Sequence, residues 1–179
     1  MFKGAIAMVQ LLILGLFIAQ GEAYPYQLLQ LIRQRHYDAF ITITKGSFYY
    51  NIDVLEEMGA LAVTAYLPTK NAFVSKTSYV ITDQGRALFK QLAAKQLLKP
   101  DKFQSPSALG LLLASDVAPD VLSQSLAQHV ADLEQECQSL EKALQVTDLT
   151  ALQQELLQHR LTLQKSDLNW YQKLQKTNQ

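Results

Sequence analysis

Apolar residues recur at helical spacing along most of this chain, interrupted in the first half by short alternating runs. In the first hundred residues this periodicity predicts four helices, over roughly 4–20, 25–36, 45–58 and 83–98. Between the third and fourth helices, the runs "ALAVTAYL" and "FVSKTSYVIT" predict two strands joined at "PTKNA". The β-branched run "FITIT" predicts a further short strand just before the third helix.

Residues suited to helix ends bound several of these predicted helices. Pro25 suits the first turn of the second helix, because proline lacks the amide that would be unpaired there. The Thr44 hydroxyl can cap the third helix, which Gly59 ends, and Thr82 or Asp83 can cap the fourth. The resulting order is helix, helix, helix, hairpin, helix, and it predicts a winged helix-turn-helix domain.

Beyond the linker "KPDKFQSPS", alternating spacings of four and three predict two long helices with apolar seams. The first seam comprises Leu126, Val130, Leu133, Cys137, Leu140 and Leu144. The second comprises Leu149, Leu152, Leu156, Leu163, Trp170 and Leu174. The segment "VTD" separates them, with Asp148 as the predicted cap of the second helix. Two such helices cannot bury both stripes alone, so we predict an antiparallel hairpin that dimerises with a second copy.

Charge divides the chain at the same linker. Residues 1–99 hold ten Lys and Arg against six Asp and Glu, a net charge of +4, and residues 100–179 hold six against ten, a net charge of −4. A basic first half favours binding of a polyanion there. We therefore predict a mainly α protein with a small β-hairpin wing, a winged helix-turn-helix domain over 1–99 and a helical dimerisation domain over 100–179.

The first 23 residues also have the pattern of a secretory signal: Lys3, an apolar run, and small residues up to Ala23. The competing interpretation is a buried first helix, since the second helix needs an apolar partner for Leu28, Leu29 and Ile32. We adopt the buried helix and keep a secreted protein as the alternative.

Motifs for catalysis and metal binding are missing from the sequence. The single cysteine permits no intramolecular disulfide, and it suits a reducing compartment. His36, His129 and His159 are widely separated, without the spacing of a metal site. We therefore expect no enzyme, no cofactor and no metal, and a cytoplasmic protein without a membrane association.

Three segments of the first half resemble motifs of the PadR-like family of bacterial transcriptional regulators. The segment "AYPYQL" resembles the family's entry into its second helix, at Tyr26, Gln27 and Leu28. The segment "KGSFYYNIDVLEEMGAL" resembles its third-helix signature, at Gly46, Ser47, Tyr49, Leu55, Glu56 and Gly59. The segment "YVITDQGRALF" resembles its wing strand and fourth helix, at Tyr79, Thr82, Gly85 and Arg86. The second half is similar in layout to the family's long helical dimerisation domain.

This resemblance implies a sequence-specific DNA-binding transcriptional regulator, a homodimeric repressor on an operator with two-fold symmetry. It implies that the third helix enters the major groove. The expected DNA contacts are Tyr26, Lys45, Ser47, Tyr49, Tyr50, Asn51, Lys70 and Lys76. Some members of the family respond to phenolic acids or other small aromatic compounds. Here Trp170, Tyr171 or the segment "SALGLLLA" could line such a pocket, but the sequence assigns no ligand residue.

Two features depart from the family pattern and support an alternative function. Asp53 stands in the third helix where the family has a polar or basic residue, and the basic wing motif is reduced to Lys76. The alternative is a protein-interaction module that kept the winged fold and lost DNA binding.

Overall fold

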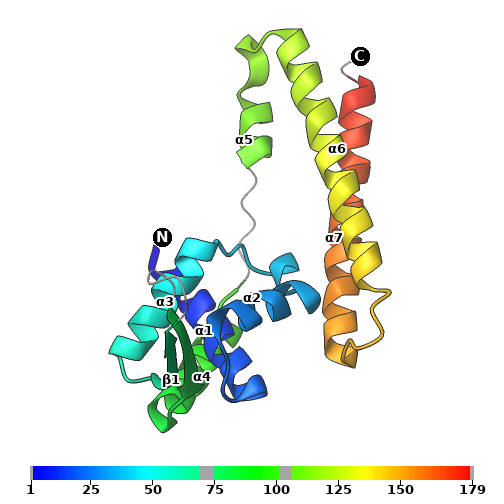
Figure 1. Cartoon of the computed structure of the whole chain (residues 1–179). Coiled ribbons are helices and arrows are strands. Elements are labelled where there is room, and N and C mark those ends of the chain that lie inside the picture. Colours follow the sequence, from blue (N-terminus) through cyan, green and yellow to red (C-terminus); the bar gives the residue numbers. More distant parts are fainter. Residues whose placement is uncertain (1, 69–74, 101–105, 178–179) are drawn as a thin grey trace. The chain divides into compact units, whose positions relative to one another are not determined.

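The computed structural model describes residues 2–68, 75–100 and 106–177. The chain divides into two compact units, Met1–Asp101 and Lys102–Gln179. Figure 1 shows the elements of both units in chain order. Each unit is described by itself below.

The described residues of the first unit form four α-helices and a two-stranded antiparallel sheet (Figure 1). In chain order, its elements are α1 (Phe2–Gln20), α2 (Pro25–Gln34), the short 3-10 helix η1 (Tyr37–Ala39), α3 (Lys45–Glu57), β1 (Leu61–Pro68), β2 (Ser75–Ile81) and α4 (Asp83–Leu97). The predicted helices and hairpin are confirmed. The predicted strand at 40–44 is wrong, because these residues form no regular structure and pair with no strand among the described residues. A β-branched run does not make a strand without a partner to complete its backbone hydrogen bonds.

Helix α1 lies at the centre of this unit and packs against α3, α4 and β2. Its side chains Ile13, Leu14 and Phe17 are fully buried, together with Leu28 and Phe48 from the next two long helices. The first helix is therefore part of the domain core, as the buried-helix interpretation predicted. Tyr26, an expected DNA contact, is 44% exposed, because Leu28 and Ile32 define the buried face of α2.

A β-bulge at Thr64 anchors the sheet to the turn between α1 and α2. The register of the sheet shifts between Val63 and Ala65. The Thr64 hydroxyl donates to Glu22 Oε1 over 2.8 Å, and the buried Ser78 hydroxyl donates to the same oxygen over 2.9 Å. These bonds lower the pKa of the Glu22 carboxyl below its ordinary value. The sheet is thus fixed to the start of α2 by side chains as well as by the backbone bridge between Ala23 and Tyr79.

The second unit is helical in all its described elements (Figure 1). These are α5 (Pro106–Leu112), η2 (Ala114–Asp116), α6 (Pro119–Ala143) and α7 (Ala151–Thr177). Helices α6 and α7 pack along each other as a hairpin. The cap of α7 is Thr150 and not the predicted Asp148: the Gln153 N–H donates to Thr150 Oγ1, and the Thr150 N–H donates to Gln153 Oε1. This reciprocal pair leaves Asp148 exposed and outside the cap.

The two predicted seams have different surroundings. Leu126, Val130, Leu133, Cys137 and Leu140 of α6 are buried, and Leu144 is half-buried. The pKa of the Cys137 thiol is raised, mainly because the side chain is buried. Helix α7 buries Leu157, Leu161, Gln164 and Tyr171. The second predicted seam forms a different stripe, and most of it is exposed. The exposed fractions are 69% for Leu152, 43% for Leu156, 46% for Leu163 and 46% for Trp170. Its end members Leu149 and Leu174 are half-buried.

Polar side chains fix the register of the hairpin. Gln164, which is 5% exposed, donates a hydrogen bond to Glu136, and Gln172 donates to Glu134 over 3.2 Å. Lys165 pairs with Glu141 at 2.6 Å on the surface. No helix in the described part of the chain is both long and apolar enough to span a membrane.

Candidate nucleic-acid interface

Helix α3 begins with a side-chain cap and an exposed first turn. Thr44 has an extended backbone, and its hydroxyl accepts a hydrogen bond from the Ser47 N–H over 3.1 Å, as the sequence predicted. Lys45 and Gly46 are exposed, and Ser47 is half-buried. The positive end of the helix dipole lies at this turn, beside a lysine. Such a turn can hold a phosphate group.

The two faces of α3 differ sharply in burial. Phe48, Ile52 and Leu55 are at most 1% exposed and join the core. Tyr50 is 60% exposed and points away from that core. Met58 is 46% exposed, because it follows the last helical residue and lies beyond the packed stripe.

Asn51 is not on the exposed face where the sequence analysis placed it. It is only 1% exposed, and its Nδ2 donates to the Ser47 carbonyl over 2.8 Å. Its Oδ1 has no hydrogen-bond partner among the described residues. An amide that is buried and bonded to its own helix is not presented to a base edge, so the structure gives no support to the expected DNA contact of Asn51.

The two other tyrosines near helix starts have mixed surroundings. Tyr49 is half-buried and meets the Phe48 ring edge-on, with ring centroids 5.7 Å apart. Tyr26, at the start of α2, stacks on Tyr24 with centroids 6.0 Å apart and is partly exposed. Tyr49 therefore has a packing role, whereas Tyr26 and Tyr50 present more of their side chains to solvent.

The structure gives little information on the two wing lysines that were predicted to contact DNA. Lys76 lies in β2, and Lys70 falls outside the described residues. Asp53 is exposed, one turn after Tyr50 on α3. The exposed part of α3 therefore combines one cation at its start with three acids, of which Asp53 is the nearest to that start.

Contacts from β2 and α4 hold the far end of α3 in place. Tyr79 is 7% exposed, and its burial, followed by the nearby Glu56 carboxylate, raises the pKa of Tyr79 to about 12. Gln84 Nε2 donates to the Met58 carbonyl over 2.7 Å. Sequence analysis matched Tyr79 and Glu56 to family motifs but did not foresee that they lie near each other. Nothing in their spacing of 23 residues indicates this, because the two come together only after β2 pairs with β1, which packs against α3.

The start of α4 packs closely against the residues that follow α3, and a glycine makes this contact possible. Thr82 caps α4 by accepting from the Gly85 N–H over 3.0 Å and donates to the Gly59 carbonyl over 2.7 Å. A Cβ on Gly85 would lie 2.1 Å from the Ala60 carbonyl oxygen. Only glycine allows this close approach, which sets the position of α3 against the rest of the domain.

Metal chemistry finds no support at this surface. In residues 2–68, 75–100 and 106–177, no group of three or more His, Cys, Asp or Glu side chains is placed to hold a metal ion. The groups gathered at the start of α3 are instead hydroxyls, backbone amides and a lysine, which are donors for phosphate oxygens.

Comparison with known proteins identifies the fold. No family model and no curated protein matches the sequence. Among solved structures, the PadR-like transcriptional regulator BC1756 from Bacillus cereus superposes with a TM-score of 0.72 at 17% identity, covering 95% of each chain. The smu.1604c protein from Streptococcus mutans gives 0.73 at 22% identity, covering 92% of this chain and 96% of its own. Bacillus subtilis PadR in complex with operator DNA gives 0.69 at 16% identity, covering 96% and 99%.

These matches span both units, so the similarity is not confined to the winged domain. The predicted resemblance and fold class are confirmed: the chain shares the fold of PadR-like transcriptional regulators over nearly its whole length.

Proposed function

We propose that this chain is a sequence-specific DNA-binding transcriptional regulator. The observation that carries the proposal is the exposed start of α3, in a fold shared with a regulator solved on operator DNA. In winged helix domains this helix enters the major groove with its first turns leading. Lys45 and Tyr50 are the two side chains that α3 offers there.

The side chains at the start of α3 are better suited to phosphate contacts than to many hydrogen bonds with base edges. Lys45 supplies a full charge, and the Ser47 hydroxyl and helix-start amides supply neutral donors. Tyr50 is long enough to meet a phosphate with its hydroxyl or a thymine methyl with its ring. Tyr26 is a second exposed tyrosine for a backbone contact.

The regulator acts, in this proposal, as a cytoplasmic homodimer that represses transcription and responds to a small molecule. The exposed apolar stripe of α7 supports dimerisation, since a second copy would cover it. Bacillus subtilis PadR has also been solved in complex with p-coumaric acid, which supports control by a small aromatic compound.

Fluorescence anisotropy tests DNA binding, with the protein's own upstream DNA, a scrambled duplex and a salt series. We expect tighter binding to the upstream DNA and a steep fall in affinity with salt. Lys45→Ala should flatten the log-log salt slope by about 0.9. Lys176→Ala removes the same charge from an exposed position of α7 and is the matched control.

The outcomes separate this function from its alternative. A Lys45→Ala slope equal to that of wild type would contradict the assigned contact. Absence of binding even at low salt would favour the protein-interaction module, for which the exposed Asp53 on α3 is the supporting observation.

A further inference from the structure

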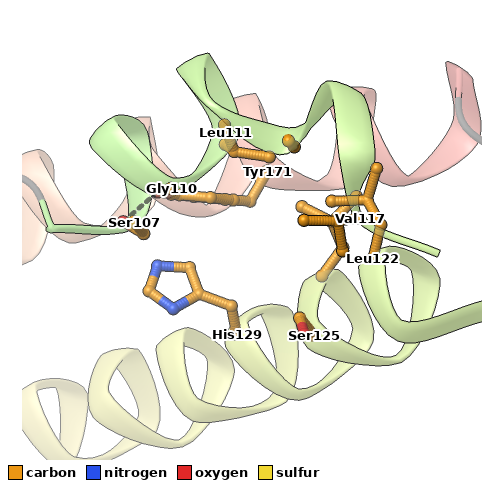
Figure 2. A pocket seen from close by; sticks show the side chains of 10 residues that line it. Ser107, Gly110, Leu111, Val117, Leu122, Ser125, His129 and Tyr171 are labelled. Atoms are coloured by element: carbon orange, nitrogen blue, oxygen red, sulfur yellow. Dashed lines mark hydrogen bonds between the residues drawn. The ribbon is translucent and has the colours of Figure 1, made fainter. Parts of the chain in front are cut away.

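An open cavity of about 300 Å³ lies inside the second unit, where α5 and the following turn cover one end of the α6–α7 hairpin (Figure 2). It lies in the volume range of ligand sites, about 300–1,000 Å³, at the lower end. Its lining includes Gly110 and Leu111 of α5, Leu122 and His129 of α6, and Tyr171 of α7. The cavity therefore joins Tyr171 and the segment "SALGLLLA", the two places where the sequence suggested a pocket.

The cavity has a polar end and an apolar end. Figure 2 shows Ser107 and His129 toward one end, and Val117 and Leu122 toward the other. At the polar end the Tyr171 hydroxyl hydrogen-bonds the Ser107 hydroxyl, and the His129 ring meets the Tyr171 ring with centroids 4.1 Å apart. This arrangement suits a flat molecule with one polar group, since convergent polar atoms orient a ligand whose remainder fills an apolar wall.

Among the described residues that line the cavity, none is Lys, Arg, Asp or Glu. A carboxylate that entered would lose its hydration without gaining a fixed cation, which is unfavourable. A hydroxyl group could instead bond the Ser107, Tyr171 and His129 cluster, while an aromatic ring would pack against Tyr171 and the aliphatic residues. The chemistry of the lining thus selects for an uncharged ligand.

We propose that this cavity binds a small, uncharged aromatic compound that carries a single hydroxyl group. The binding site stands on the geometry of the second unit alone; its consequence for transcription rests on the proposed function. Occupancy has a built-in reporter, because Trp170 is the single tryptophan of the chain and its ring lies 4.6 Å from that of Tyr171.

Two variants test the site on the full-length protein. Gly110 lines the cavity, and a Cβ built on it meets no described atom within 4 Å, so Gly110→Leu adds bulk at the cavity wall from a position where the first side-chain atom has room. Since glycine is also the poorer helix former, α5 should persist in this variant. His129→Leu removes the ring and its hydrogen-bonding nitrogens at the polar end, and His159→Leu is its control, because His159 is exposed on α7 and does not line the cavity.

The probes are para-cresol and benzyl alcohol, with para-toluate and benzoate as their anionic counterparts, titrated by calorimetry and by Trp170 emission at neutral pH. We expect saturable binding of one uncharged probe per chain, little binding of the anions, and no binding to Gly110→Leu. Loss of the polar contact in His129→Leu should weaken binding by about tenfold, from a net hydrogen-bond contribution near 1.4 kcal/mol. His159→Leu should bind like wild type.

Several results would overturn the proposal: no binding of either uncharged probe to the wild type, equal binding of the anions, or undiminished binding to Gly110→Leu. A change of molecular mass in Gly110→Leu would assign the cavity to a contact between subunits and would also overturn it. Because these titrations contain no DNA, their failure is distinct from a failure of DNA binding in the anisotropy experiment.

Discussion

At the scale of single residues, α3 carries opposing charges on its exposed side. Lys45 attracts a polyanion, whereas Asp53, one turn beyond Tyr50, repels it. The acids Glu56 and Glu57 lie later in the helix, and Glu56 is engaged with Tyr79. If α3 binds DNA as proposed, Asp53 is therefore the acid that we expect to affect its affinity most.

Neutralising Asp53 should tighten DNA binding. We expect Asp53→Asn to raise affinity several-fold at low salt, since removing a surface charge near a phosphate changes the binding free energy by roughly 1 kcal/mol. Anisotropy titrations at two salt concentrations check this, with Glu57→Gln as a control that removes a charge farther along α3. Equal gains from both substitutions would point to net charge alone and not to the position of Asp53.

A second residue-scale prediction concerns the buried phenol. The pKa of Tyr79 rises from its ordinary value of 10 to about 12 in the folded protein, through burial and Glu56. Between these pH values the folded chain keeps a proton that the unfolded chain releases, so stability falls as pH rises through this window. Below pH 10 both states are protonated, and this group adds no pH dependence.

Urea unfolding of wild type and Tyr79→Phe over this alkaline range checks the prediction. Other tyrosines and lysines titrate in both proteins, so the difference between the two curves isolates Tyr79. Wild type should lose stability relative to the variant as the pH is raised. A constant difference across the range would show that Tyr79 is not shifted.

At the scale of elements, helix ends were predictable where one residue could supply the cap. Thr44 and Thr82 both cap the helices predicted for them. Asp148 was the wrong choice for α7, because Thr150 and Gln153 form a reciprocal pair that a single aspartate cannot match. The strand expected at 40–44 failed for a related reason, since strand propensity does not reveal whether a partner exists.

The cap of α7 gives a matched pair of substitutions. Thr150→Ala should lower the stability of the first turn of α7 by about 1 kcal/mol, whereas Asp148→Ala should leave it unchanged. Hydrogen exchange of the amides at the start of α7 measures this directly. Faster exchange in Asp148→Ala than in Thr150→Ala would contradict the assignment of the cap.

The inward face of α7 shows where sequence periodicity is ambiguous. Leu157, Leu161, Gln164 and Tyr171 follow the same four-and-three spacing as the exposed stripe that the sequence analysis selected. A polar glutamine concealed the buried stripe, because its hydrogen bond to Glu136 is not visible in the sequence. The cavity was harder still, since three helices contribute to it. The sequence pointed to Tyr171 and to the segment "SALGLLLA" but not to the α6 side of the cavity, where Leu122, Leu126 and His129 recur on one face.

At the scale of the whole molecule, the exposed stripe of α7 indicates how two copies would associate. Its members Leu156, Leu163 and Trp170 are seven residues apart, the repeat of a coiled-coil seam. We predict that these residues form the dimer contact. The α6 residues of the first seam were predicted for the same contact, but they are already buried within the hairpin of a single chain. A stripe left exposed by its own chain is the better candidate for a partner helix.

Substituting this stripe tests dimerisation without disturbing the hairpin core. Leu163→Glu should convert a dimer into a monomer, because it places a charge in the proposed contact at a position already 46% exposed. Gln154→Glu adds the same charge at another exposed position of α7. Sedimentation equilibrium gives the mass of each protein. A wild type that stays monomeric at all concentrations, or a Leu163→Glu dimer, would contradict this contact.

Sequencing of DNA duplexes retained by the full-length protein from a random library tests the central claim most directly, because the library offers every short target sequence at once. The account predicts an enriched motif of two half-sites with two-fold symmetry, with centres about one helical turn of DNA or a multiple of it apart. It also predicts that Tyr50→Ala weakens this enrichment. Retention of duplexes without any common motif would contradict a sequence-specific regulator.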